Sequence, residues 1–175
     1  SVLRLAARFR IPVDTLVRGE ALFFAGDAHA SGDALSMGAA PRFDVLWPPE
    51  YMRVGENGAS VVLRVEYGEG SVLLPGDLDS AGERRLLELS PTLEADLLQV
   101  GHHGSAGSSS LRFIAQVAPD FAVASVGAGN RFGHPAESVV RKYGYVLADS
   151  NRFYRTDVDG SVEFVLYRDL GVTFP

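Results

Sequence analysis

The chain has 175 residues, of which 46% are hydrophobic, and it carries a formal net charge of −6 and no cysteine. This length and apolar content predict one compact domain, while the acidic balance excludes a general electrostatic clamp for nucleic acid, because such a clamp needs clustered Lys and Arg. Without cysteine, disulfides and thiolate metal sites are excluded, so any bound metal would be held by His, Asp or Glu.

Residues 1–41 begin the chain with short patterns and a loop-like stretch. Apolar residues at helical spacing predict a helix over residues 1–10, and two β-like runs predict a hairpin over residues 14–24. Residues 25–41 predict an irregular loop, in which His29 is interpreted as a solvated side chain. No run approaches the ~20 apolar residues of a membrane span, and no signal peptide is present, so we expect a soluble chain. It begins without methionine inside a helix-then-strand pattern, so we also expect a fragment of a longer protein.

The middle of the chain alternates strands with helices. The predicted strands are residues 42–46, 59–67, 71–74 and 96–100. The second and third of these form a hairpin across Gly68-Glu69-Gly70. An amphipathic helix over residues 80–89 is capped by Asp79 or Ser80, with Glu83 near the reciprocal capping position. A second capped helix is predicted over residues 108–117.

The last third of the chain adds one strand, one helix and three terminal strands. The predicted strands are residues 121–126, 145–148, 151–156 and 161–167. A Gly-rich loop over residues 127–133 leads to His134-Pro135 and then to a helix over residues 136–143. A turn at residues 157–160 joins the last two strands. The alternation predicts an α/β or mixed α+β domain with two layers of strands.

Side chains that can bind a metal follow three of the apolar strands. Asp77 follows the strand of residues 71–74, His102 and His103 follow the strand of residues 96–100, and His134 follows a third strand. Imidazole and carboxylate are the ligands that Zn²⁺, Mn²⁺ or Fe²⁺ would accept here. Because strand ends bring distant residues together, these side chains are predicted to share one rim of the sheet.

The two adjacent histidines leave two arrangements open. Neighbouring residues of an extended strand point to opposite faces, so at most one of His102 and His103 would bind a given metal. A bend at Gly101 and Gly104 would allow both rings to reach the same site.

Each candidate also has a structural interpretation. A lone histidine is often a core or surface residue, and Asp77 could simply close a turn. The serines of residues 105–110 could include a nucleophile, but no G-x-S-x-G elbow is present and serines before a helix are typical of capping. Arg152, Tyr154 and Arg155 could touch phosphate or form the exposed face of a strand.

Five motifs in order resemble one known family. They are Asn57-x-x-Ser60-x-Val62-Leu63, LLPGDLDSAGE, DLLQVGHHGSAGSSS, SVGAGNRFGHP and FYRTDVDGSVEF. Over residues 42–164 they resemble the C-terminal metallo-β-lactamase-fold domain of ComEC-type DNA-internalisation (competence) proteins. The resemblance implies an αββα sandwich, of which residues 1–175 would be the C-terminal part, truncated at its N-terminus. It also implies one or two divalent metal ions, Zn or Mn, that activate water for phosphodiester hydrolysis.

The same resemblance implies partners and a location. In that family the domain is attached to a membrane channel that takes up transforming single-stranded DNA, and it is expected to degrade the strand that does not enter. Single-stranded DNA is therefore the expected substrate, and the channel of the same parent protein is the expected partner. The expected location is a soluble domain tethered to the inner membrane of a bacterium.

The resemblance also assigns expected roles to residues. Asp77 would bridge the metals, His102 or His103 would be a ligand or an acid that protonates the leaving oxygen, and His134 would be a late ligand or lie behind the ligands. Expected metal ligands are thus Asp77, His102, His103 and His134, and expected catalytic residues are His102 and His134. Expected supporting hydrogen-bonding residues are Asn57, Ser60, Ser105 and Asn130.

The chain departs from the family at one motif. Metallo-β-lactamase-fold hydrolases carry a His-x-[His/Asp]-x-Asp-His cluster after an early strand, and this chain contains none. Its place would be upstream of Ser1, so the chain would hold about half of the metal site. Three hypotheses stay open: part of a metal-dependent nuclease, a catalytically incomplete binding or scaffold module of a DNA-uptake channel, or a related hydrolase acting on another ester.

Overall fold

The computed structural model describes residues 18, 21–23, 41–49, 59–90, 92–167, 169 and 171–173. The predicted helix over residues 1–10, the first arm of the predicted hairpin and most of the loop over residues 25–41 lie outside the described residues, as do His29 and Asn57. Within the described part, no helix is long and apolar enough to cross a membrane.

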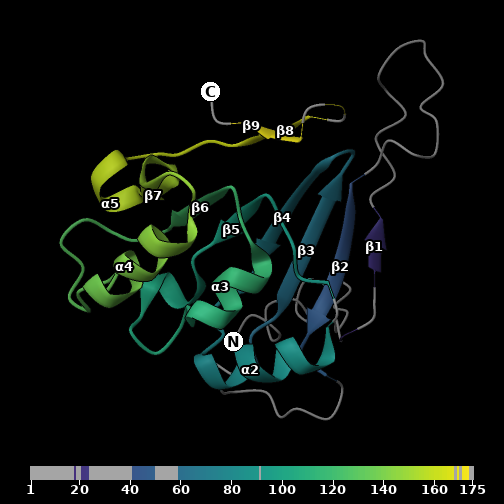
Figure 1. The fold of residues 1–175 in the computed structure, drawn as a ribbon, viewed down its shortest axis with the longest axis horizontal. Coiled ribbons are helices and arrows are strands. Elements are labelled where there is room, and N and C mark those ends of the chain that lie inside the picture. Colours follow the sequence, from purple (N-terminus) through teal and green to yellow (C-terminus); the bar gives the residue numbers. More distant parts are fainter. Residues whose placement is uncertain are drawn as a thin grey trace, which may run out of the picture.

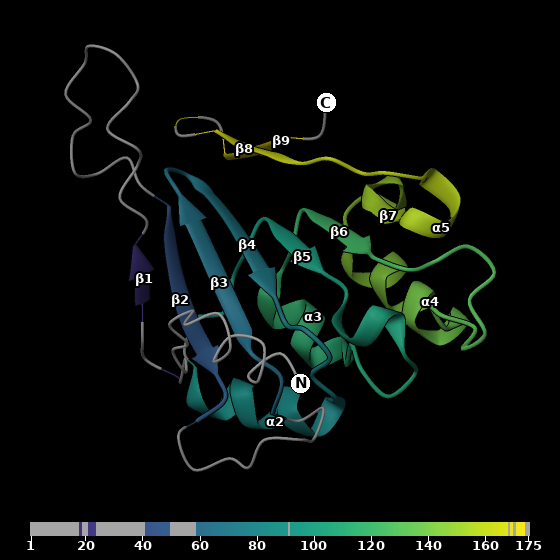
Figure 2. The same cartoon turned by 180° about the vertical axis from the view of Figure 1, so that it is seen from behind.

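The described chain is built on one seven-stranded sheet with the strands in sequence order, and helices cover one of its faces (Figure 1; Figure 2). The strands are β1 Ala21–Phe23, β2 Arg42–Trp47, β3 Val62–Tyr67, β4 Gly70–Leu74, β5 Leu97–Gln99, β6 Phe121–Ala124 and β7 Phe153–Arg155. Strands β1 to β4 pair antiparallel, whereas β4 to β7 pair parallel. The carboxyl ends of four neighbouring strands therefore meet at one edge of the sheet.

The core lies between the parallel half of this sheet and three helices. The helices are α2 Ser80–Leu89, α3 Leu111–Val117 and α4 Glu137–Val146. Alternate strand residues face them, since successive side chains of a strand point to opposite faces. The fully buried side chains include Leu73, Leu98 and Ala122 from the strands and Leu86, Ile114, Val139 and Tyr143 from the helices. The predicted hairpin of β3 and β4 and the predicted helix α2 are confirmed.

Two acidic side chains bind backbone N–H groups at the starts of α2 and α3. Asp79 caps α2, because its carboxylate accepts hydrogen bonds from the backbone N–H groups of Ala81 at 3.0 Å and Gly82 at 2.8 Å. Glu83 does not close a capping box. Its carboxylate is 1% exposed and accepts from the N–H groups of Ser109 at 2.5 Å and Ser110 at 2.8 Å. A buried charge from α2 thereby satisfies the donors that precede α3.

Behind this contact lies the buried ring of Tyr143. Its hydroxyl faces the Oγ of Ser109 at 3.5 Å. Burial raises the pKa of Tyr143 above its ordinary value of 10.0, and the nearby charge of Glu83 acts in the same direction. The hydroxyl therefore remains neutral inside the core.

The C-terminal third differs from the predicted three strands. The predicted strand over residues 145–148 is wrong, because α4 continues through Val146: Val139, Tyr143 and Leu147 keep the four-residue spacing of one buried helix face. Residues 157–160 do not join two paired strands. A short helix, α5 Thr156–Asp159, follows β7, which pairs in parallel with β6.

The predicted second layer of strands is represented, among the described residues, by a two-stranded ribbon. It consists of β8 Val165–Tyr167 and β9 Gly171–Thr173, paired antiparallel. The ribbon meets the sheet where β4 begins: a Cβ atom on Gly70 would lie 3.1 Å from the carbonyl carbon of Gly171. Just before β8, Phe164 packs on Phe121 and Tyr154 at centroid distances of 5.7 and 5.5 Å.

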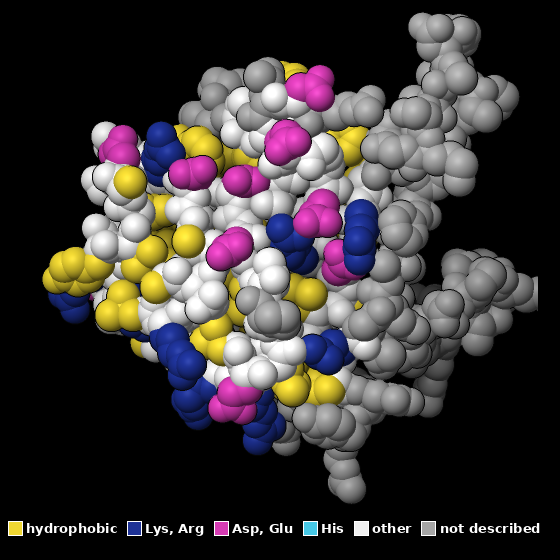
Figure 3. Space-filling model, turned by 45° about the vertical axis from the view of Figure 1, so that its right-hand side comes forward, with side chains coloured by type: hydrophobic (Ala, Val, Ile, Leu, Met, Phe, Trp, Pro, Cys, Tyr) yellow, Lys and Arg dark blue, Asp and Glu magenta, His cyan; other side chains and the backbone are white. Residues whose placement is uncertain are grey.

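The described surface shows no wide field of one charge on the face drawn in Figure 3. Lys and Arg side chains lie interspersed with Asp and Glu side chains across this face. Exposed Arg84 and Arg85 on α2 lie in the same helix as the exposed Glu88.

Candidate metal centre

The candidate site lies at the carboxyl edge of the parallel strands. Pro75-Gly76-Asp77 follows β4, and the histidine turn, residues Gly101–Gly104, follows β5. A hydrogen bond of 2.9 Å from the N–H of His102 to the carbonyl of Gly76 joins the two segments. The predicted rim shared by an aspartate and a histidine pair is thus present in the structure.

His103 and Asp77 are two possible metal ligands that face each other. The Nε2 atom of His103 lies 3.5 Å from Oδ1 of Asp77. On the other side of the ring, Nδ1 lies 2.8 Å from the carbonyl oxygen of Ser125, which follows β6. A carbonyl can only accept, so Nδ1 carries a proton, and it is Nε2 that faces the Asp77 carboxylate. Two electron-pair donors that face each other can share a proton or a metal ion.

The histidine turn has an unusual backbone that places its two rings. His102 has φ 49° and ψ 42°, and His103 has φ 53° and ψ 20°, so both residues adopt the left-handed conformation. The chain is therefore bent at the histidines rather than extended, but the two rings face different partners, His103 towards Asp77 and His102 towards His134. Left-handed conformations cost non-glycine residues ~1–3 kcal/mol each, and such strain is concentrated at functional sites.

The second pair of rings joins His102 to His134. Their ring centroids lie 6.2 Å apart with an interplanar angle of 68°. The Nδ1 atom of His134 is buried and has no hydrogen-bond partner among the described residues. Buried polar atoms almost always have a hydrogen-bond partner, so this nitrogen is a candidate to bind a hydrogen-bond donor or a metal ion.

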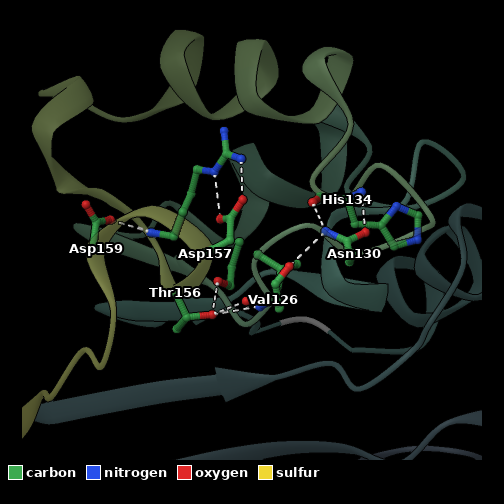
Figure 4. Close-up of polar contacts among 9 residues, drawn as sticks. Val126, Asn130, His134, Thr156, Asp157 and Asp159 are labelled. Atoms are coloured by element: carbon green, nitrogen blue, oxygen red, sulfur yellow. Dashed lines mark hydrogen bonds and ion pairs between the residues drawn. The ribbon is translucent and has the colours of Figure 1, made fainter.

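A cavity of about 440 Å³ opens beside these histidines. It is lined by His103, Ser125, Val126, Gly127, Asn130, Phe132 and His134. Asn130 holds the loop that forms one wall (Figure 4): its side-chain NH₂ donates to the carbonyl of His134 at 2.7 Å, and its side-chain oxygen accepts from the N–H of His134 at 2.9 Å. The amide of Asn130 thus fixes where His134 meets the cavity.

Two further predicted residues lie next to the ligand-bearing segments. Ser60 lies against Gly76, where an added Cβ atom would be 3.4 Å from the Cβ of Ser60. Ser105 follows the histidine turn, and its N–H donates to the carbonyl of His102 at 2.9 Å. Ser105 therefore helps to close the turn through its backbone.

The described donors fit a divalent metal only in part. Zinc needs three or four protein ligands, and manganese needs a similar or larger number of donors. Within the described ranges, no group of three or more His, Asp or Glu side chains is close enough to hold an ion. The four expected ligands fall into two pairs, Asp77 with His103 and His102 with His134. The first pair could supply two donors to a metal.

The segment after β7 supports the cavity wall in a way that the sequence interpretation missed. The hydroxyl of Thr156 accepts from the N–H of Val126 at 2.8 Å and donates to its carbonyl at 2.7 Å (Figure 4). Val126 directly follows Ser125, the residue whose carbonyl orients His103. Thr156 lies in the YRTD-x-DG motif, so the motif was recognised, but its role was not.

Arg155 and Asp157 hold Thr156 in place. The guanidinium of Arg155 donates two hydrogen bonds to the carboxylate of Asp157, at 3.1 and 2.7 Å, and this contact lowers the pKa of Asp157. The N–H of Arg155 donates to the carboxylate of Asp159 at 2.7 Å. These local bonds compete with a strand ladder and explain why the chain turns into α5 here.

We predict that Thr156→Val lowers metal affinity and hydrolytic activity about tenfold, because the hydroxyl supports the segment that orients His103. Removing the hydroxyl leaves the N–H and carbonyl of Val126 without their partner. Metal titration and the rate of hydrolysis measure the two effects. Thr156→Ser, which keeps the hydroxyl, is the matched control. Equal metal affinity of the valine and serine variants would contradict this role.

Comparison with known proteins places this geometry in a family. A family model described as the metallo-beta-lactamase superfamily matches residues 38–128. "Competence protein ComA" of Neisseria gonorrhoeae is 36% identical over 160 residues, which are 91% of this chain and 23% of that protein. "ComE operon protein 3" of Bacillus subtilis is 38% identical over 123 residues, 70% of this chain and 16% of that protein. "Recombination protein 2" of Haemophilus influenzae is 36% identical over 128 residues, 73% of this chain and 16% of that protein.

The chain therefore belongs to the metallo-β-lactamase superfamily, and its mixed sheet with helices confirms the predicted fold class. Its similarity to bacterial competence proteins confirms the resemblance to ComEC-type proteins. The chain spans less than a quarter of the length of these relatives, at 23% and 16% of the first two. The match to the family model, residues 38–128, includes Asp77 and the histidine turn but ends before His134.

Proposed function

We propose that this chain contributes to a metal-dependent phosphodiesterase that degrades the DNA strand left outside during DNA uptake. The observation that carries this proposal is the pair of His103 and Asp77, with the ring of His103 oriented by Ser125 and both of these residues lining the cavity. The name of one relative, "Competence protein ComA", refers to competence, which supports a DNA substrate. We further propose that residues 1–175 form one C-terminal part of the domain, tethered to the inner membrane through its parent protein.

The proposed roles follow from the two pairs of side chains. Asp77 and His103 would hold a divalent Zn or Mn ion, which when bound lowers the pKa of a water molecule and neutralises charge on a phosphate. His102 and His134, the second pair, would act as ligands or as acids that protonate the leaving oxygen. The hydrogen bonds that hold the histidine turn in its left-handed conformation would keep both rings in position for this chemistry.

A second function is favoured by a specific observation. The described residues contain no group of three metal ligands, so a catalytically incomplete binding or scaffold module of the uptake channel also fits. In that case the cavity would bind DNA or the channel without cleaving. A related hydrolase acting on another ester would keep the chemistry and change the substrate.

The test is hydrolysis by the full-length protein with Mn²⁺ or Zn²⁺ added after removal of bound metal. Cleavage of single-stranded DNA that depends on the metal and stops with a chelator would support the nuclease. If the protein binds DNA but cleaves it with none of the metals, the nuclease hypothesis is wrong and the binding or scaffold function is supported. Cleavage of another phosphodiester or ester in preference to DNA would identify the related hydrolase.

A further inference from the structure

One wall of the cavity carries an aromatic ring that the proposed chemistry does not use. Phe132 lines the cavity, yet the residue is 67% exposed. Its ring stacks on the ring of His134, with centroids 5.8 Å apart and an interplanar angle of 21°. Single exposed apolar side chains are common, but this ring is both exposed and part of the cavity wall, so it is accessible to a ligand in the cavity.

The loop that carries Phe132 is held from both sides. Asn130 donates to the carbonyls of Gly127 at 3.2 Å and His134 at 2.7 Å, so its amide spans the loop. The N–H of Gly133, directly after the ring, donates to the carbonyl of Asn130 at 3.4 Å. Phe132 is therefore presented on a hydrogen-bonded loop rather than on a free tail, and its ring is oriented before any ligand binds.

The surroundings of the ring select the kind of ligand. The guanidinium carbon of Arg131 lies over the Phe132 ring, 4.8 Å from its centroid, and the ring of His134 stacks on the same phenylalanine. A ring that already holds a flat cation matches a planar base joined to a phosphate, because the base can replace the guanidinium on the ring and the released cation can pair with the phosphate. An apolar side chain of a partner protein would bind here less favourably than a base, since charged and polar groups flank the ring.

We propose that Phe132 is a stacking platform for one base of a single-stranded nucleic acid whose adjoining phosphate enters the cavity. Bases of a duplex are already stacked on each other, so the platform favours unpaired strands over duplexes. Arg131 would then contact the phosphate backbone next to the stacked base. This inference rests on the proposed function, because the phosphate it positions is the one to be hydrolysed.

The experiment compares two oligonucleotides of equal length and charge, one with bases and one abasic, both with hydrolysis-resistant phosphorothioate links. Fluorescence anisotropy with the full-length protein measures both affinities. A stacked base contributes ~1–3 kcal/mol, so the wild type is expected to bind the base-containing strand about 5- to 150-fold more tightly than the abasic strand. Phe132→Ala is expected to bring this ratio close to 1. Phe132→Tyr, which keeps the ring, is expected to retain it.

Each other outcome overturns the proposal. A ratio near 1 in the wild type, or a ratio unchanged by Phe132→Ala, removes the stacking role. Equal loss of both affinities in the alanine variant assigns Phe132 to loop structure. Metal-dependent cleavage of a phosphodiester-linked abasic strand tests the proposed hydrolysis separately, so the stacking platform can fail while the nuclease stands.

Discussion

Asp77→Asn is expected to lower metal-dependent hydrolysis by the full-length protein about 10²- to 10³-fold. Asparagine keeps the size of the side chain and one oxygen, but it removes the negative charge that faces Nε2 of His103 at 3.5 Å. A carboxylate that holds a metal contributes several kcal/mol to catalysis, and each ~1.4 kcal/mol corresponds to a tenfold change in rate. Because the Asp77 side chain is 49% exposed, the change should leave the fold intact. The measurement is kcat/KM on single-stranded DNA, together with metal affinity.

The chain offers a matched control two residues away. Asp79→Asn makes the same chemical change at a carboxylate that caps α2 and lies outside the pair. Asparagine caps a helix about as well as aspartate, so this variant is expected to keep both its stability and its activity. His103→Ala should resemble Asp77→Asn, since it removes the other donor of the pair. Full activity in both Asp77→Asn and His103→Ala would remove the proposed metal site.

The elements that frame the site could be predicted from the sequence because their signals are local. The apolar run of β4, its turn at Gly68-Glu69-Gly70 and the amphipathic pattern of α2 each specify structure within a short window. The same local reasoning failed after β7. There the side chains of Asp157 and Asp159 bind Arg155, and these bonds outweigh the strand pattern of the residues themselves.

The candidate site was predictable in its residue types but not in its arrangement. Strand ends predicted that Asp77 and the histidine pair share one rim, because parallel strands align their carboxyl ends, but not that His103 is the one facing Asp77. His102 points towards His134 because the histidine turn has left-handed backbone angles. The types of the residues in the turn do not indicate these angles. The orienting partner of His103 is the backbone carbonyl of Ser125, and a carbonyl leaves no signal in the sequence. The buried contact of Glu83 was missed for a related reason, since its partners are backbone N–H groups beyond its own helix.

The histidine turn depends on close packing at its last residue, Gly104. Its φ is 82°, and an added Cβ atom would lie 2.5 Å from the Cβ and 2.8 Å from the Cα of Pro135. At the same place, the N–H of Ala136 donates to the carbonyl of Gly104 at 2.8 Å. The turn with His103 and the loop with His134 therefore meet at a point with no room for a side chain.

Gly104→Ala is accordingly expected to lower the free energy of unfolding by roughly 2–6 kcal/mol, the sum of backbone strain and overpacking that each cost ~1–3 kcal/mol. Two other glycines separate these causes. Gly129 has φ 65° with open space around it, so Gly129→Ala measures the cost of backbone strain alone. Gly127 has open space and no positive φ of this kind, so Gly127→Ala is expected to show neither strain nor overpacking. Urea unfolding of the three variants measures the effects. Packing at Pro135 is the main cause if Gly104→Ala loses clearly more stability than Gly129→Ala; equal losses would mean that the two histidine segments do not depend on this contact.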